Sequence, residues 1–362
     1  MDSSDDDNLN LVSRGEGDCL SPQPLVSVAM PVRNESQFIR RNLLQLMEQD
    51  YPHDSIEIII ADGMSDDGTR EIIAELQTQD SRIRLIDNPQ SIVPTGLNAA
   101  IQSSQGAIVI RVDGHVEVAK DFIRSSVDAL RGHSAAWGAG GPIVHEGKTL
   151  FGKAVAAAMS HPAGVGNASH RFANFEGYGE GTAFPAFYRW VFDRVGFYDE
   201  SLVRNQDDEF YFRVLQAGGK FFITPKIRYV YFVRGRVSNL FWQYFQYSFW
   251  RIPIIRKHGR PTTLRQVLPT LFWLLMLVLA CTGLILGNYL LAVGLPVLYV
   301  LTLAAIGFFE SRVYGLRVGI LMPVAMIVMH CAYATGMLCG AFAFVFAPNA
   351  WTRKGKMARL TR

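Results

Sequence analysis

The sequence has few charged residues, and acidic ones are missing from a long stretch. Charged side chains make up 19% of the 362 residues and hydrophobic ones 49%, whereas an ordinary soluble domain carries about 25% charged residues. No Asp or Glu occurs between Phe210 and Phe309. This composition excludes disorder for most of the chain, and it also excludes a purely soluble protein. The net charge of +3 arises because an acidic N-terminal part offsets a basic C-terminal part.

Cysteine is scarce as well. The four cysteines are Cys19 in a polar stretch and Cys281, Cys331 and Cys339 in apolar runs. None forms a CxxC pair, so we expect neither a disulfide framework nor a structural zinc site. The first residues are acidic rather than basic, so we expect no signal peptide.

The length corresponds to about two domains, and the composition changes along the chain. We expect a disordered acidic tail over residues 1–24, an α/β domain over 25–233, amphipathic basic interface helices over 234–265, about three transmembrane helices over 266–347 and a basic tail over 348–362.

Short apolar strands alternate with helical patterns in the α/β domain. The spacing predicts strands over residues 25–30, 56–61, 83–86 and 107–112, and helices over 36–48, 69–76 and 95–102. This alternation indicates βαβ units and a mostly parallel sheet covered on both faces. Residues 132–185 are rich in Gly and Ala, and we expect extended structure and mobile loops there. Helices are expected again over 187–195 and 209–216.

Polar motifs follow the first two predicted strands. Pro31-Val-Arg-Asn-Glu35 follows one strand, and Asp62-Gly-Met-Ser-Asp-Asp-Gly-Thr69 follows the next. Open α/β sheets bind ligands at this edge, where acids accept hydrogen bonds from ribose hydroxyls. Helix capping alone is the alternative explanation of these polar residues. No G-x-G-x-x-G follows the first strand, which disfavours a Rossmann dehydrogenase.

Two further motifs carry acids at element ends. Asp113 and His115, two apart after an apolar strand, can both reach one cation, and carboxylate plus imidazole suits Mn²⁺ or Mg²⁺. Three adjacent acids, Asp207 to Glu209, open a helix, where the helix dipole favours them. They are either an ordinary charged helix start or the position of a general base.

In this order, the motifs resemble glycosyltransferase family two, with its GT-A fold, over residues 25 to about 225. The resemblance implies nucleotide binding by Pro31, Arg33, Glu35, Asp62, Ser65 and Asp113. Asp113-Gly-His115 stands where the family has D-x-D, so the His departs from the pattern; Asp113 and His115 would hold the metal. Gln206-Asp207 stands where many members have Glu-Asp, which makes Asp207 the base. The acceptor-side candidates are Gln206, Asp208, Arg213 and Arg251.

The sequence most resembles the succinoglycan-type glucosyltransferase branch, through the stretch Arg204-Asn-Gln-Asp207, the Asp-x-His and the apolar C-terminal part. That branch adds sugars to a polyprenyl-diphosphate-linked oligosaccharide. The resemblance implies inverting transfer of a hexose from a nucleotide sugar, with UDP favoured, and a metal that neutralises the leaving diphosphate.

Other functions stay open. A processive polysaccharide synthase usually carries Q-x-x-R-W, but Gln246 to Trp250 has Phe249 at the Arg position, and the spans are too few to line a pore. A polyprenyl-monophosphate glycosyltransferase would use the same fold, and a non-catalytic membrane scaffold would have a degenerate domain. Nucleic-acid binding is disfavoured because the basic residues adjoin apolar runs of lipid length. The oligomeric state is not indicated.

Three apolar runs, residues 267–287, 289–309 and 318–346, are each long enough to cross a bilayer. The segment before them, residues 239–265, is aromatic and basic, which is typical of an interface helix; a core helix with a basic edge is the alternative. In the third run, Ala332, Gly336 and Gly340 suit close helix packing, and His330 is expected to be a packed polar residue.

The positive-inside rule places the basic segment and the α/β domain on the cytoplasmic side of the inner membrane. If the third run crosses once, the basic tail ends outside, against that rule. A re-entrant hairpin within residues 318–346, or a helix lying in the interface, would instead leave the tail inside.

Overall fold

The computed structural model describes residues 21–346, and the chain forms two compact units. The first contains Met1–Val144, Phe172–Glu200 and Gln206–Tyr231; the second contains His145–Arg171, Ser201–Asn205 and Phe232–Arg362. Cys19, most of the expected acidic tail and the whole expected basic tail lie outside the described residues.

A single large sheet forms the centre of the first unit. Its strands are β1 (Val26–Val32), β2 (Ile56–Asp62), β3 (Ile83–Asp87), β4 (Ile108–Arg111), β6 (Ala136–Gly141), β8 (Gly177–Gly179), β9 (Ala183–Tyr188) and β10 (Lys220–Ile223). The strand order is β3-β2-β1-β4-β9-β6-β10-β8. The first four of these strands are mutually parallel, β9 is antiparallel to both neighbours, and β10 is again parallel to β6. The prediction of a mostly parallel sheet is confirmed.

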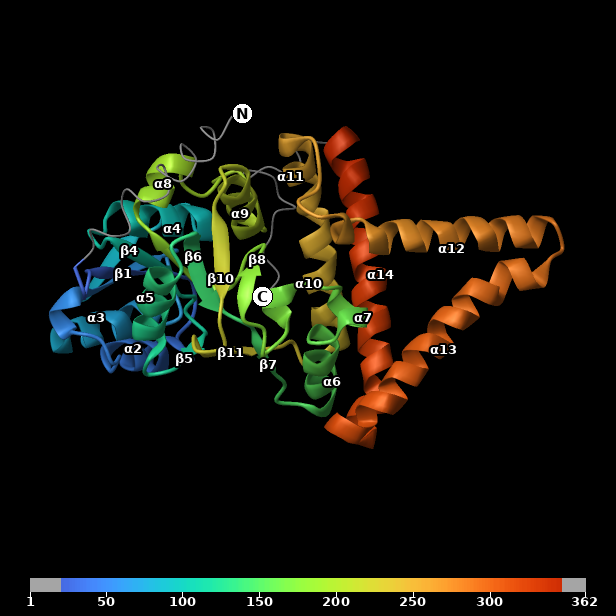
Figure 1. Ribbon diagram of the computed structural model, residues 1–362, viewed down its shortest axis with the longest axis horizontal. Helices are drawn as coiled ribbons and strands as arrows, with labels where there is room; N and C mark the ends of the chain where they lie inside the picture. The colour runs from blue at the N-terminus through green and yellow to red at the C-terminus, as the bar shows by residue number, and fades with distance from the viewer. Residues whose placement is uncertain (1–20, 347–362) are drawn as a thin grey trace, which may run out of the picture. The chain divides into compact units, whose positions relative to one another are not determined.

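Helices cover this sheet (Figure 1). They are α2 (Ile39–Met47), α3 (Thr69–Gln79), α4 (Val93–Gln102), α5 (Phe122–Gly132), α8 (Trp190–Val195) and α9 (Gln206–Gln216); the shorter elements are η1 (His53–Ser55), β5 (Glu117–Val118) and β11 (Tyr229–Phe232). Helix α4 packs on β1 and β2, and α5 packs on β6 and β9. Every residue of β1 is buried, as expected of a parallel strand covered on both faces.

Two expectations about secondary structure were wrong. Leu150–Met159, within the region expected to be loops, forms helix α6. Alanine is the strongest helix former, and the Oγ1 of Thr149 caps the helix by accepting a hydrogen bond from the backbone N–H of Gly152. The helix expected over 187–195 begins only at Trp190, because the preceding residues end strand β9. Periodicity does not distinguish a short buried strand from a buried helix.

The second unit is helical. Besides α6 it contains α7 (Pro162–Val165), η2 (Ser169–Arg171), α10 (Val237–Phe249), α11 (Arg251–His258), η3 (Leu264–Gln266), α12 (Leu268–Ile285), α13 (Tyr289–Tyr314) and α14 (Leu316–Phe346). Strand β7 (Val144–Glu146) lies where the chain enters this unit. Helix α14 packs against α6, α10 and α13, with Met322, Ala325 and Met326 completely buried among them.

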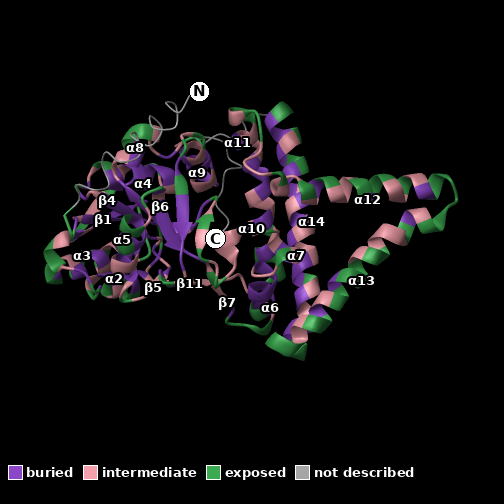
Figure 2. Cartoon of the chain, in the orientation of Figure 1, coloured by how far each residue is buried: buried purple, intermediate pink, exposed green. Residues whose placement is uncertain are grey.

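The helices α12, α13 and α14 are each long and apolar enough to cross a membrane. Figure 2 shows that the surfaces of α12 and α13 are mostly exposed or half-buried. Within their most apolar windows only 17% of the residues of each are buried, compared with 44% for α14. Helix α14 is therefore the one enclosed by protein, whereas α12 and α13 present apolar side chains outward.

Helix α14 is continuous from Leu316 to Phe346, so the re-entrant hairpin considered for this run is wrong. Its glycines serve close packing instead of a bend. A Cβ at Gly336 would lie 2.2 Å from the carbonyl oxygen of Phe245, and one at Gly340 would lie 2.8 Å from that of Phe249. The prediction of close packing at these small residues is confirmed. His330, expected to be a packed polar residue, has its Nδ1 2.8 Å from the hydroxyl of Tyr299.

Candidate active site

The carboxyl ends of β1, β2 and β4 meet at one edge of the sheet. In the register of β1 and β2, Val32 stands opposite Asp62, and the backbone N–H of Gly63 donates to the carbonyl of Val32 at 2.7 Å. Strand β4 lies on the other side of β1 and ends at Arg111. The three loops that follow these strands therefore lie next to one another.

Asp62 is completely buried and fixes the loop that follows β2. Its carboxylate accepts hydrogen bonds from the backbone N–H of Ser65 at 2.9 Å and from the Ser65 hydroxyl at 2.5 Å. The Nη1 of Arg70 lies 2.8 Å from its Oδ2, and the Nη2 of the same arginine pairs with Asp87. In this conformation Asp62 and Ser65 hold the loop in place; their contact with a nucleotide stays a prediction.

Further hydrogen bonds join this loop to the loop after β1. The side chain of Asn34 exchanges hydrogen bonds with Asp66, and the carboxylate of Asp67 accepts from Ser36 and Thr69. Desolvation raises the pKa of Asp67, but these hydrogen bonds outweigh it and lower the pKa to about 2. Sequence reasoning missed Asn34, Asp67 and Thr69. An Asp two residues before a Thr commonly accepts a hydrogen bond from the backbone N–H of that Thr, and this local pattern could have revealed the last two.

Pro31 and Arg33 lie on either side of the end of β1. Pro31 is buried within the strand opposite Ala61. Arg33 is exposed, and its Nη1 lies 3.4 Å from the carbonyl oxygen of Ser91. Of the two, only Arg33 presents its side chain to solvent at the edge where the loops meet.

His115 is held by Glu35. The Nδ1 of His115 lies 3.1 Å from the Oε1 of Glu35, which is buried, while 41% of the His115 side chain is exposed. Gly114 allows this approach, because a Cβ there would lie 2.9 Å from Cγ1 of Val32 and 3.1 Å from Cγ of Glu35. A carboxylate at Nδ1 sets the tautomer and leaves Nε2 as the atom available to a ligand.

Arg111 contacts two of the candidate carboxylates. Its Nε lies 3.0 Å from Oδ1 of Asp113 and its Nη2 3.2 Å from Oδ2, and its Nη1 lies 3.4 Å from Oδ2 of Asp207. Only 12% of the Arg111 side chain is exposed. Sequence reasoning missed this role of Arg111. The signal was the closeness of a basic residue at the end of β4 to the acid two residues further on.

Asp207 lies near the start of α9, and its environment makes it more basic than an ordinary aspartate. Burial raises the pKa of Asp207, Arg111 opposes this rise, and the negative charges of Asp208 and Asp113 add to it. The backbone N–H of Asp208 donates to its Oδ1 at 3.0 Å. The net effect is a raised pKa, which is what a general base at neutral pH requires.

Glu209 and Arg213 form a buried ion pair that fastens α9 to the end of α8. The Nη2 of Arg213 lies 2.9 Å from Oε2 of Glu209, which is completely buried. The same guanidinium donates to the carbonyl oxygens of Val195, Gly196 and Phe197. Arg213 therefore has a clear structural function, and contact with an acceptor stays a prediction.

The remaining acceptor-side candidates differ in exposure. Gln206 is buried at the first position of α9, and Asp208 is partly exposed. Arg251 is buried on α11 of the second unit. Their contact with an acceptor stays a prediction.

A divalent cation fits this site only if it is shared with a substrate. Within residues 21–346 no three His, Cys, Asp or Glu side chains are grouped so that they could hold a metal by themselves. Asp113 and the Nε2 of His115 provide two donors. Mg²⁺ characteristically takes one or two protein ligands together with substrate phosphates, and Mn²⁺ tolerates an imidazole among oxygen ligands.

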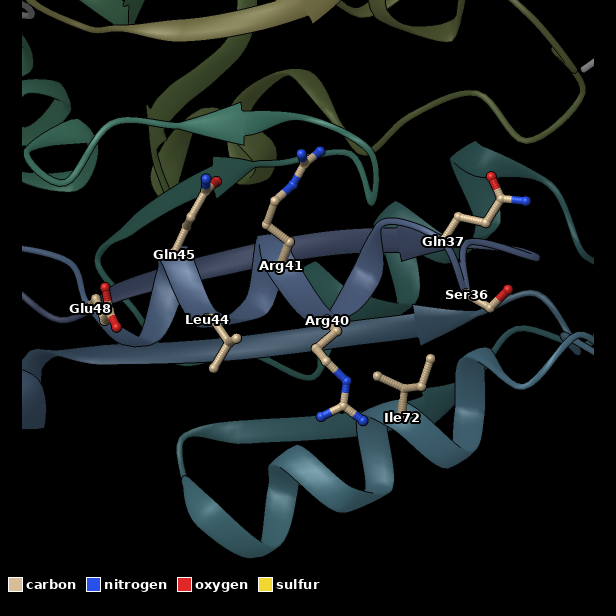
Figure 3. A pocket seen from close by; sticks show the side chains of 8 residues that line it. All are labelled: Ser36, Gln37, Arg40, Arg41, Leu44, Gln45, Glu48 and Ile72. Atoms are coloured by element: carbon tan, nitrogen blue, oxygen red, sulfur yellow. The ribbon is translucent and has the colours of Figure 1, made fainter.

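A separate hollow of about 480 Å³ lies on the surface of α2 and α3 (Figure 3). It is lined by Ser36, Gln37, Arg40, Arg41, Leu44, Gln45, Glu48 and Ile72. Figure 3 shows these side chains leaving α2 in different directions, with Arg41 and Gln45 on one side and Arg40 and Leu44 on the other. Arg40 pairs with Glu75, and Arg41 with Glu117. Because these polar side chains diverge and do not point toward one common position, this hollow does not have the character of an active site.

Comparison with known proteins identifies the family. The glycosyl transferase family 2 model matches residues 27–194. The succinoglycan biosynthesis protein ExoA of Rhizobium meliloti (strain 1021) is 33% identical over 322 residues, which cover 85% of this chain and 92% of that protein. The chain therefore belongs to glycosyl transferase family 2.

Two more distant proteins also match over most of the chain. The dolichyl N-acetyl-alpha-D-glucosaminyl phosphate 3-beta-D-2,3-diacetamido-2,3-dideoxy-beta-D-glucuronosyltransferase of Methanococcus voltae is 24% identical over 87% of this chain and 96% of its own. The mannosyltransferase PcManGT from Pyrobaculum calidifontis, solved in complex with GDP-Man and Mn²⁺, shares the fold with a TM-score of 0.54. Its identity is 18%, with 87% of this chain and 89% of that chain covered. The first unit thus has the GT-A fold expected from the sequence.

Proposed function

We propose that this glycosyltransferase moves a hexose, with inversion, from a nucleotide sugar to a polyprenyl-diphosphate-linked saccharide at the cytoplasmic face of the inner membrane. UDP is the nucleotide that the sequence resemblance favours. Similarity to a succinoglycan biosynthesis protein supports exopolysaccharide synthesis as the process. Three helices able to cross a membrane support an acceptor that is anchored in lipid.

One observation carries the proposal: Arg111 contacts both Asp113 and Asp207. In the proposed reaction these two residues act on opposite sides, Asp113 at the donor diphosphate and Asp207 at the acceptor hydroxyl. A shared guanidinium brings both carboxylates into one site, as a direct displacement at the anomeric carbon requires.

In this mechanism Asp207 takes the proton of the acceptor hydroxyl. The oxygen attacks the anomeric carbon from the side opposite the nucleoside diphosphate, which leaves with the electrons of the broken bond. Arg111 offsets part of the negative charge of the two carboxylates before substrate binds. Asp113 and His115 would hold a divalent cation together with the donor phosphates, and such a cation neutralises charge on a leaving diphosphate.

The acceptor has a second candidate. The relative from M. voltae carries a dolichyl-linked sugar phosphate in its name, which favours an acceptor whose sugar is joined to lipid through one phosphate. Synthesis of a polymer and transfer to bare polyprenyl phosphate are competing reactions that the same fold could support.

Product analysis tests the proposal. Purified full-length protein is incubated with a panel of nucleotide sugars and three acceptors: polyprenyl diphosphate carrying a saccharide, polyprenyl phosphate carrying one sugar, and bare polyprenyl phosphate. We expect one hexose to be added to the diphosphate-linked saccharide. A polymer, or transfer only to a monophosphate acceptor, would contradict the proposed acceptor. No transfer from any nucleotide sugar would contradict the activity itself.

A further inference from the structure

A group of basic and aromatic side chains converges inside the second unit. It consists of His145, His170, Arg171, Tyr244 and Arg265, here called the basic cluster; the charge of Arg171 acts on His145, His170 and Tyr244, and that of Arg265 acts on His170. They come from four separate elements, β7, η2, α10 and η3. Only the tertiary structure brings these side chains together from distant parts of the chain, so no sequence motif predicts the group.

Arg171 is at the centre of the basic cluster. Its Nη1 lies 3.1 Å from Nε2 of His145, whose Nδ1 lies 3.1 Å from the hydroxyl of Ser160. The guanidinium can only donate, so His145 accepts through Nε2 and its ring is neutral. Burial and the charge of Arg171 lower the pKa of His145, and the same two causes with Arg265 lower the pKa of His170 to about 3. The cations of the cluster are therefore Arg171 and Arg265.

The Tyr244 hydroxyl marks the cluster as incomplete. The residue is only 7% exposed, and within residues 21–346 no protein group forms a hydrogen bond with this hydroxyl. Buried polar groups in proteins are nearly always hydrogen-bonded. The positive charge of Arg171 acts on this phenol, and its hydroxyl is free to donate a hydrogen bond to a bound ligand.

The ligand must bring negative charge, because the second unit has little of its own. Its acidic residues within the described range are Glu146, which is exposed, and Glu310, which lies 3.9 Å from His161. No described carboxylate forms an ion pair with Arg171. An arginine and a tyrosine can both donate hydrogen bonds to a phosphate, because a phosphate has several acceptor oxygens.

The position of the basic cluster along the chain indicates a lipid-linked phosphate. Arg265 lies in η3, and the first candidate membrane helix starts at Leu268. Tyr244 belongs to the apolar core in which α10 packs against α14, and these two helices run side by side in Figure 1. A phosphate held here would lie at the beginning of the apolar helices, along which a hydrocarbon chain could extend.

We propose that the basic cluster binds the phosphate of the polyprenyl-linked acceptor, with Arg171 and Tyr244 as its main contacts; this inference rests on the proposed function. The same chemistry would also bind a free phosphate or diphosphate, so the test includes both sources.

The test measures lipid binding without sugar transfer. Full-length protein in detergent micelles is titrated with farnesyl diphosphate, farnesyl phosphate, farnesol and inorganic pyrophosphate, and binding is followed by calorimetry. We expect Arg171→Gln to weaken farnesyl diphosphate binding at least about tenfold and Tyr244→Phe about threefold, since a charge-assisted contact is worth more than a neutral one. Arg317→Gln, the same change at an exposed residue of α14, should leave binding unchanged.

A second measurement separates binding from folding. Because Tyr244→Phe removes a buried hydroxyl without a partner, the melting temperature of the ligand-free protein should stay equal or rise, while the affinity for lipid phosphate falls. A purely structural role would lower the melting temperature instead, and this would overturn the inference.

Three binding results would also overturn it. They are wild-type affinity in both cluster variants, farnesol binding as tight as farnesyl diphosphate, and pyrophosphate binding as tight as farnesyl diphosphate. Protein that binds lipid phosphate through Arg171 but transfers no sugar would contradict the proposed function alone. Protein that transfers sugar while the variants bind lipid normally would contradict this inference alone.

Discussion

The Nδ1 of His115 lies 3.1 Å from the Oε1 of Glu35. The contact joins the loop after β1 to the loop after β4 and gives Glu35 a role that the sequence did not indicate. Glu35 was expected to bind nucleotide, whereas here it orients the imidazole proposed to hold the metal. Metal-binding histidines usually donate their second N–H to a carboxylate or carbonyl in this way.

The first prediction concerns this pair. Glu35→Gln should weaken Mn²⁺ binding about tenfold, because losing such a partner typically costs 10- to 100-fold in metal affinity. The measurement is a Mn²⁺ titration of the protein in the presence of UDP by electron paramagnetic resonance.

The residues proposed to hold the metal are tested by activity. Asp113→Ala should abolish transfer, and His115→Ala should lower it strongly and change the metal preference. Activity that persists in excess chelator would show that no metal is required.

The second prediction concerns the base. Asp207→Asn should lower turnover at least about 10²-fold, the low end for the loss of an acid–base group, while nucleotide-sugar binding is retained. Asp208→Asn is the same change one residue further on and should lower turnover far less than Asp207→Asn does. Glu209→Gln should mainly lower the melting temperature, because it breaks the buried pair with Arg213. Wild-type turnover in Asp207→Asn together with an inactive Asp208→Asn would show that Asp208, and not Asp207, is the general base.

The third prediction concerns pH. In the proposed mechanism transfer requires ionised Asp207, so we expect the rate to fall as the pH drops through its pKa, which is raised above the ordinary value. Arg111 lowers that pKa, while Asp208 and Asp113 raise it. Tyr198 and Tyr211 also interact with Asp207, but both are neutral in the acid range because burial raises the pKa of each phenol. Arg111→Gln should therefore move the acid limb of kcat to higher pH. Arg111→Lys keeps the charge and should move it less. An acid limb at the same pH in all three proteins would exclude Asp207 as the titrating group.

The fourth prediction concerns membrane topology. The continuous helix α14 favours a single crossing, which would place the two ends of the membrane region on opposite sides. A cysteine introduced by Met357→Cys into a cysteine-free background should then react only with a reagent confined to the non-cytoplasmic side of oriented vesicles. Reaction from the cytoplasmic side would instead favour α14 lying in the interface.

Part of this protein was determined by local sequence alone. The apolar residues that run through β1 and β2 are removed from water only if both faces of the strands are covered. The parallel sheet and the positions of its loops could therefore be predicted from the apolar pattern. The three apolar helices followed from length and composition for the same reason. Periodicity failed at α6 and β9, because a short buried apolar segment is compatible with either a helix or a strand. The elements that pack against it decide which of the two forms.

Only the tertiary structure decided how the polar side chains pair. Arg111 and Asp207 are 96 residues apart in the chain, and Glu35 and His115 are 80 apart. Residues this far apart carry no shared spacing by which a sequence pattern could associate them. The basic cluster is drawn from four elements for the same reason. Sequence determined which groups lie at the ends of strands, and packing determined which of them touch, because a side chain's partner depends on strand order and on what fills the space around it.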